Sequence, residues 1–119
     1  MKEYSLEEYI KQSKKPTKGR WRLPTIEELL TLVDYTKHNP ASSEAIASNY
    51  YWSSTTSASG TCSAWGVYFG TGRSDYRSKY DSLYVRCVRE TGNGLEWSAD
   101  APKRLTWYEA MEYAESLNV

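Results

Sequence analysis

The sequence has few of the residues that build metal centres and disulfide frameworks. Its 119 residues include one histidine, His38, and two cysteines, Cys62 and Cys87. A zinc site needs three or four closely spaced ligands, so we expect no metal and no cofactor. Cys87 follows a strand-like pattern, which predicts a buried thiol, whereas Cys62 lies in a Ser- and Gly-containing segment. A disulfide between them stays open, because sequence does not give their separation.

Net charge and long apolar runs are also absent. Fifteen basic side chains balance 15 acidic ones, so the composition predicts neither a nucleic-acid interface nor a polybasic, lipid-binding patch. No apolar run approaches the roughly 20 residues of a membrane span. Residues 1–15 have no apolar core and do not resemble a signal peptide. We therefore expect no nucleic acid and no membrane insertion, and the localisation stays open, with a virion or a cell surface as candidates.

A length of 119 residues fits a single domain, and three capping boxes predict where its helices begin. The boxes are Ser5 with Glu8, Thr25 with Glu28, and Thr106 with Glu109. Apolar residues with helical spacing follow each box. The predicted helices are residues 5–15, 25–38 and 105–118, and residues 41–48 could add one or two further turns.

The middle of the chain changes to the alternating pattern of β-strands. The predicted strands are residues 51–55, 64–69, 83–89 and 95–98. The last two are joined by an Asn-Gly hairpin signal at residues 91–94. Each of the five tryptophans lies beside a strand or helix signal, and we assign all of them to the core. They are Trp21, Trp52, Trp65, Trp97 and Trp107.

Residues 70–82 have the composition of a binding loop. The segment is rich in Tyr, Ser, Gly, Asp and Arg, the residues that antibody loops use for contact area and adaptable hydrogen bonds. We expect residues 56–63 and 70–82 to decorate one face of a rigid scaffold. The alternative is an ordinary polar hairpin loop on a β-rich domain. The candidate ligand-binding residues are Tyr68, Thr71, Arg73, Ser74, Asp75, Tyr76, Arg77, Ser78, Tyr80, Asp81 and Ser82.

Four motifs resemble one known family, the Lcl C-terminal domain family, which is named after bacterial collagen-like adhesins. The motifs are WRLPTIEELLTLVD at 21–34, YWSST at 51–55, AWGVYF at 64–69 and YVRCVR at 84–89. The resemblance covers most of residues 20–89. It implies an α+β, C-type-lectin-like fold akin to that of formylglycine-generating enzymes, with two main helices packed on a small twisted antiparallel sheet.

The order of the last elements departs from the family. Segments resembling GLEW at 94–97 and LTWYEAMEYAESLN at 105–118 come first in the family, ahead of its WRLPT motif. One interpretation is a circular permutation of a single domain, 1–119, with a family core at 20–93, because neighbouring termini permit it. The other is a piece of tandem copies, in which residues 94–119 open the next copy and residues 5–15 supply the first helix.

The resemblance implies a non-catalytic ligand-binding module that recognises a protein or glycan on another cell or particle surface. Some proteins of this fold are variable proteins of diversity-generating retroelements, in which mutagenesis rewrites such a patch. The alternatives are an invariant adhesin-type glycan-binding domain, a structural domain of an adhesin or virion, and an enzyme of the formylglycine-generating type with a reactive cysteine pair. The calcium-site sequences Glu-Pro-Asn and Trp-Asn-Asp do not occur, so calcium-dependent sugar binding is not expected.

Overall fold

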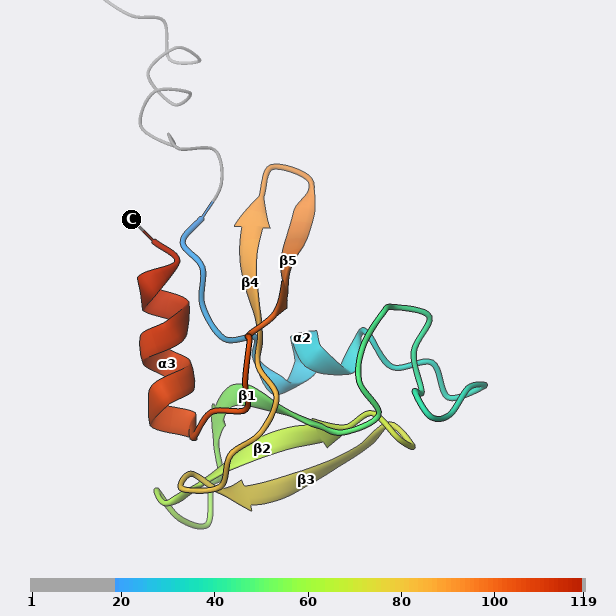
Figure 1. The fold of residues 1–119 in the computed structure, drawn as a ribbon, viewed down its shortest axis with the longest axis horizontal. Helices are drawn as coiled ribbons and strands as arrows, with labels where there is room; N and C mark the ends of the chain where they lie inside the picture. The colour runs from blue at the N-terminus through green and yellow to red at the C-terminus, as the bar shows by residue number, and fades with distance from the viewer. Residues whose placement is uncertain (1–18, 119) are drawn as a thin grey trace, which may run out of the picture.

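Two helices and five strands make up the described part of the chain, residues 19–118, in the computed structural model (Figure 1). The predicted α+β class, with small antiparallel sheets and two helices, is confirmed. Neither described helix has the length and apolar character needed to cross a membrane. The helix predicted for residues 5–15 lies outside the described residues. The elements are α2 (Ile26–Leu30), β1 (Tyr50–Thr56), β2 (Ser63–Tyr68), β3 (Arg73–Ser78), β4 (Arg86–Thr91), β5 (Gly94–Asp100) and α3 (Trp107–Ser116).

The strands form two antiparallel sheets. One has the order β1-β2-β3, and the other is the β4-β5 pair. Thr91 pairs with Gly94 across the β4-β5 turn, which confirms the hairpin predicted at residues 91–94. The two turn residues are Gly92 and Asn93, and Gly94 begins β5. Figure 1 shows this hairpin projecting from the three-stranded sheet, with α3 alongside it. The strand predicted over residues 83–89 begins only at Arg86, because Leu83 and Tyr84 make single bridges to Leu105 and Tyr51 where the chain passes between the sheets.

Part of the predicted binding loop is a strand. Residues 73–78 form β3, which pairs along its whole length with β2, so the prediction of a loop over 70–82 is wrong there. The sequence RSDYRS lacks apolar alternation because both faces of this edge strand are partly or fully exposed. The turn before it needs Gly72, whose φ is +87° and where a Cβ would lie 2.6 Å from Cγ1 of Val33.

The helix predicted over residues 25–38 is much shorter in the structure, where α2 spans only Ile26–Leu30. After Leu30 the chain tightens into i→i−3 hydrogen bonds, with Thr31 N donating to Glu28 O and Val33 N to Leu30 O. Asp34 N then donates to Ala41 O, 2.8 Å away, which turns the chain back. Residues 41–48 contain no helix, so the further turns predicted there are also wrong. Tertiary hydrogen bonds, including one from Arg86 Nη2 to Ala45 O at 2.7 Å, hold that segment in an irregular path.

The core consists of two clusters. One lies between α3 and the sheets and centres on Trp52, whose Nε1 donates to Leu105 O at 2.9 Å. The other lies under α2 and centres on Tyr51, Val67 and Phe69. Trp52 alone among the tryptophans is fully buried. Trp21, Trp97 and Trp107 are half-buried and pack against these clusters, at the edge of the core. Trp65 is half-buried and its ring meets Tyr76 instead, so the assignment to the core is wrong for this residue.

The C-terminal elements are packed into the same core. Ala110 and Ala114 of α3 are buried against the Trp52 cluster, whereas Met111, predicted on the same stripe, is exposed. Trp107 Nε1 donates to Ser53 O at 3.0 Å. Asn118 accepts from Trp21 N at 2.7 Å and donates to Trp21 O at 2.9 Å. Residues 94–118 thus contribute both a strand and a core helix to the structure.

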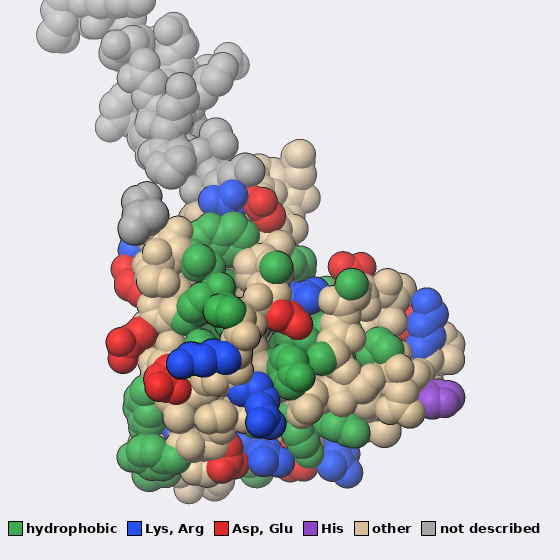
Figure 2. Space-filling view, in the orientation of Figure 1, with side chains coloured by type: hydrophobic (Ala, Val, Ile, Leu, Met, Phe, Trp, Pro, Cys, Tyr) green, Lys and Arg blue, Asp and Glu red, His purple; other side chains and the backbone are tan. Residues whose placement is uncertain are grey.

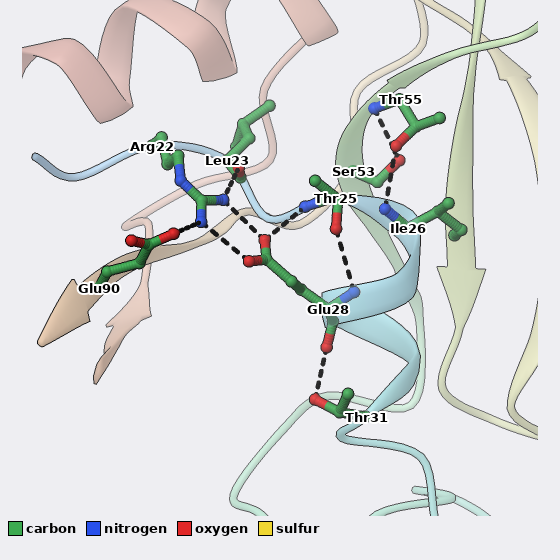
Figure 3. A network of polar contacts seen from close by, with 9 residues as sticks. All are labelled: Arg22, Leu23, Thr25, Ile26, Glu28, Thr31, Ser53, Thr55 and Glu90. Atoms are coloured by element: carbon green, nitrogen blue, oxygen red, sulfur yellow. Dashed lines mark hydrogen bonds and ion pairs between the residues drawn. The ribbon is translucent and has the colours of Figure 1, made fainter. Parts of the chain in front are cut away.

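A polar network ties the WRLPT segment to α2 and β4 (Figure 3). Arg22 forms a bidentate contact with Glu28, at 2.6 Å and 2.8 Å. Glu28 also accepts from Thr25 N at 2.9 Å, and Thr25 Oγ1 accepts from Glu28 N at 3.2 Å, which confirms the predicted capping box. The Arg22 hydrogen bonds lower the pKa of Glu28 below its ordinary value. Glu90 approaches Arg22 at 3.5 Å from β4.

Candidate ligand-binding surface

The predicted site residues lie on β3, on the turns at its two ends and at the end of β2. Tyr68 ends β2 and pairs with Arg73 across the turn that contains Thr71. Because side chains alternate along a strand, β3 sends its residues to opposite faces of the sheet. The surface therefore has two sides. Arg73, Asp75 and Arg77 share one face, and Ser74, Tyr76 and Ser78 share the other, while Tyr80, Asp81 and Ser82 follow in the next turn.

On the first face, two arginines surround a pair of tyrosines. The rings of Tyr50 and Tyr68 are tilted, with centroids 5.0 Å apart. The Arg77 guanidinium carbon lies 4.5 Å from the Tyr50 centroid, a cation–π contact. Arg73 Nη2 donates to Tyr50 Oη at 3.3 Å. Tyr50 lies outside the predicted residues, yet it organises both arginines.

Carboxylates accompany both arginines. Asp75 lies 3.7 Å from Arg73 and Asp81 lies 3.4 Å from Arg77. The side chains of Arg73 and Asp75 are 65% and 46% exposed, and such surface pairs contribute little to stability. These groups are thus available for contact with another molecule. Figure 2 shows Lys and Arg side chains gathered over the lower, three-stranded sheet, with acidic side chains among them.

On the second face, an aromatic pair spans two strands. Trp65 of β2 is directly opposite Tyr76 of β3, and their ring centroids are 4.2 Å apart. Trp65 is half-buried and Tyr76 is exposed. The pair is flanked by the serines of β3. This arrangement offers an aromatic plane beside small hydroxyl groups, and the sequence did not predict it, because Trp65 was assigned to the core.

A second aromatic contact joins the turn after β3 to α3. Tyr80 lies 5.7 Å from Tyr108, centroid to centroid, and both rings are exposed. Tyr108 is 28 positions away in the sequence, so nothing local places it there. Its one sequence signal is an aromatic residue on the polar side of an amphipathic helix. Between the predicted residues, Lys79 is buried, with Nζ 3.0 Å from Thr56 Oγ1 and 3.9 Å from the Trp107 centroid, and so belongs to the scaffold.

One known family matches most of the chain. The sequence model of the Lcl C-terminal domain family matches residues 3–89. The chain belongs to the Lcl C-terminal domain family. The match contains β1 to β3 and most of β4, and it ends before the β4-β5 turn. Comparison with curated proteins and with solved structures found no match.

The two cysteines of this Lcl C-terminal domain are both free thiols. Cys87 on β4 is completely buried, and burial raises the pKa of its thiol to about 11, so the group is protonated at neutral pH. The prediction of a buried thiol at Cys87 is confirmed. Cys62 is exposed at the end of the loop before β2. The disulfide that the sequence left open is not formed.

A metal-binding cluster is not assembled among residues 19–118. No group of three or more His, Cys, Asp or Glu side chains is placed to hold a metal ion there. An open hollow of about 290 Å³ is lined by Gly19, Arg20, Arg22 and Glu90. None of the predicted site residues lines it. The candidate surface lies outside this hollow and presents exposed aromatic and charged side chains, which suits contact with another surface.

Proposed function

We propose that this Lcl C-terminal domain is a non-catalytic ligand-binding module, and that its surface around β3 recognises a protein or a glycan on another cell or particle. One observation carries the proposal. Arg73 is exposed by 65% of its side chain, and Tyr76 and Tyr80 are exposed by 47% and 69%. Tyrosine and arginine are the residues that most often anchor interfaces. Burying three such groups on a partner supplies contact area that the scaffold itself does not use.

The proposal includes a C-type-lectin-like scaffold, circularly permuted. The support is the β4-β5 hairpin, in which the last family strand runs through a two-residue turn into a strand that the family would place first. Neighbouring terminal strands are what a permutation needs. The buried face of α3 supports it further, because this helix completes the cluster around Trp52.

The proposal also holds that the surface is a diversified one, rewritten by a diversity-generating retroelement. Six of the predicted residues are exposed, on an edge strand and its turns, where substitutions usually change stability by less than about 0.5 kcal/mol. The source DNA tests this part. We expect a reverse transcriptase and a near-identical template repeat beside the coding sequence. Their absence would favour an invariant adhesin-type surface.

The burial of Cys87 supports a non-catalytic role. An enzyme of the formylglycine-generating type would need a reactive thiol pair, and Cys87 is fully buried with its pKa raised to about 11. Thiolate, not thiol, is the nucleophile. Turnover of a peptide cysteine that is lost in Cys62→Ser or Cys87→Ser would favour the enzyme instead.

The experiment replaces Arg73, Tyr76 and Tyr80 together by serine. We expect this variant to lose every specific signal that the unaltered protein gives on glycan arrays and on displayed surface proteins. Its Tm should change by less than about 4 °C, which corresponds to under 1 kcal/mol. Arg77 and Lys79 are left in place because they pack on Tyr50 and Trp107.

The matched control replaces three exposed side chains elsewhere, Arg104, Leu95 and Met111, by serine. This control should keep the binding signals. If the control loses them as the β3 variant does, or if the β3 variant keeps them, the surface around β3 is not the ligand site.

A further inference from the structure

The outer edge of β3 carries backbone groups in a regular, accessible row. β3 is the last strand of the sheet, and Figure 1 shows it at the molecule's lower border. Lys79 N donates to Cys62 O at 2.9 Å, in the register that also pairs Ser63 with Ser78. Hydrogen-bonded pairs alternate along antiparallel strands. The residues of β3 that point their N–H and C=O groups outward are therefore Ser74, Tyr76 and Ser78.

Some of these outward backbone groups already have hydrogen-bond partners within the same chain. Tyr76 N donates to the Asp75 Oδ1 carboxylate oxygen at 3.0 Å, which agrees with an outward N–H. Ser78 O accepts from Asp81 N at 2.9 Å. Among residues 19–118, the backbone of Ser74 and the carbonyl of Tyr76 have no partner on the outer side. An exposed edge of this kind is a template for another strand.

We propose that β3 pairs, antiparallel and about a two-fold axis, with β3 of a second copy of this chain. The sequence around Tyr76 is self-complementary. When Tyr76 lies opposite Tyr76 of the second copy, Asp75 lies opposite Arg77, and Arg77 lies opposite Asp75. Ser74 then exchanges hydrogen bonds with Ser78. Asp75 and Arg77 occupy non-hydrogen-bonded positions, where opposite side chains approach most closely.

Neighbouring registers fit less well. Centring the pair on Asp75 would place the two Asp75 carboxylates opposite each other and Arg73 opposite Arg77, and like charges directly opposite are destabilising. Centring it on Ser74 would pair Tyr76 with Gly72, whose N–H is already bonded to Tyr68 O at 2.7 Å. Centring on Ser74 would pair Asp75 with Arg73, but only the register centred on Tyr76 uses the whole outward row while pairing Asp75 with Arg77. That register also brings Arg73 opposite Lys79, whose ammonium group is held by Thr56 and Trp107.

The pairing would exchange one contact of Asp75 for another. In the single chain its carboxylate caps Tyr76 N and lies 3.7 Å from Arg73. In the pair it turns to Arg77 of the second copy and frees Tyr76 N for the new ladder. The two three-stranded sheets become one continuous sheet, with two copies of the aromatic and arginine faces side by side. A two-fold contact of this kind uses the same patch on both copies.

The experiment is sedimentation equilibrium of the full 119-residue chain without any ligand, from about 10 µM to 1 mM, a range that covers weak association. It does not depend on the proposed function. The single variants Asp75→Arg and Arg77→Asp each place like charges opposite each other. We expect each to raise the dimer dissociation constant at least about tenfold. The double variant Asp75→Arg with Arg77→Asp restores both opposite-charge pairs and should dimerise as the unaltered chain does.

A mixture of the two single variants gives the most specific test of the pairing. Asp75→Arg carries two arginines and Arg77→Asp carries two aspartates, so a mixed pair is complementary at both positions. We expect heterodimers from components that are monomeric alone. The matched controls reverse exposed charges elsewhere, Glu112→Arg and Arg104→Asp, and should dimerise normally. Circular dichroism confirms that each variant is folded.

Each possible outcome either supports or overturns the pairing of β3 with β3. Concentration-dependent protection of the Ser74 and Tyr76 amides from hydrogen exchange, together with heterodimers from the mixture, would support the pairing. A chain that stays monomeric up to about 1 mM overturns it. So does a dimer whose dissociation constant is unchanged in both single variants, because another surface then makes the contact.

Discussion

Glu28 shows how much a single side chain does in this fold. Its carboxylate accepts from Arg22 twice and from Thr25 N once, while its own N–H is capped by Thr25. The side chain is only 21% exposed. The five-residue helix α2 is too short to be stable through its own hydrogen bonds. The network in Figure 3 therefore fixes the start of α2 against β4.

The lowered pKa of Glu28 predicts a pH-dependent contribution to stability. A carboxylate whose pKa is lower in the folded state stabilises that state above the ordinary value of 4.5. The contribution is lost as the pH falls through the lowered value. Glu28→Gln should reduce the free energy of unfolding by about 1.5–3 kcal/mol at pH 7, as for a hydrogen bond to a charged group. The deficit should shrink as the pH falls below 4.5 and through the lowered pKa, because the unaltered side chain then becomes protonated too.

Urea denaturation of both proteins at several pH values gives this difference directly. Glu112→Gln is the control, because Glu112 is exposed on α3 and should change little at any pH. A deficit that keeps its size as the pH falls from 7 to well below 4.5 would contradict the role given to the ionised carboxylate.

At the residue scale, the sequence predicted features that depend on neighbouring residues, but it did not predict contacts between residues far apart in the chain. The boxes at Thr25 and Thr106 are both present, because a cap depends on residues three positions apart. Trp65 looked like a core residue, but its ring meets Tyr76 on a partly open face. Tyr108 meets Tyr80 across 28 positions. Such pairs depend on strand register and helix packing, which a sequence pattern does not contain.

At the element scale, β3 is the clearest case in which tertiary pairing decides the structure. Its residues have the composition of a loop, and β2 holds them as a strand through the register from Ser63–Ser78 to Tyr68–Arg73. The opposite happens at α2, where the apolar spacing continues to Val33 but the helix ends at Leu30. Hydrophobic periodicity reports which residues are buried, and Val33 does pack on the core. It does not report whether the backbone stays helical.

The last two elements give a prediction about chain order. Removing residues 94–119 takes away β5 and α3, and with them Leu105, Ala110 and Ala114 of the Trp52 cluster. We expect residues 1–93 alone to be unfolded by circular dichroism and to show no cooperative melt, since several large core losses of about 2–5 kcal/mol each exceed the stability of a small domain.

The control for this truncation keeps all residues but cuts the chain. A protease site inserted between Gly92 and Asn93, at the exposed turn, should be cleaved without loss of the folded signal, because loop tips tolerate nicking. A stable, cooperatively folded fragment 1–93 would contradict the permuted domain and favour the tandem-copy interpretation.

At the scale of the whole molecule, a family scaffold and a contact surface occupy separate sets of residues. The family match covers residues 3–89, and its buried positions form most of the two clusters, which Ala101, Leu105, Ala110 and Ala114 complete. The sequence predicted the α+β class, and it placed the candidate surface on residues 68–82. It did not predict that this segment is an edge strand, and it omitted Tyr50, Trp65 and Tyr108 from the surface. Those three residues come to the surface only through the packing of β1, β2 and α3.

The central claim is that the scaffold does not need the outward side chains around β3. The most direct measurement is the fraction of protease-resistant clones in a display library randomised at the six exposed predicted positions. These are Thr71, Arg73, Tyr76, Ser78, Tyr80 and Ser82. A control library randomises six buried positions, Leu23, Leu29, Trp52, Val67, Val85 and Cys87. We predict that most clones of the first library stay resistant and almost none of the second. Equal loss of resistance in both libraries would contradict the claim, because the residues around β3 would then be part of the core.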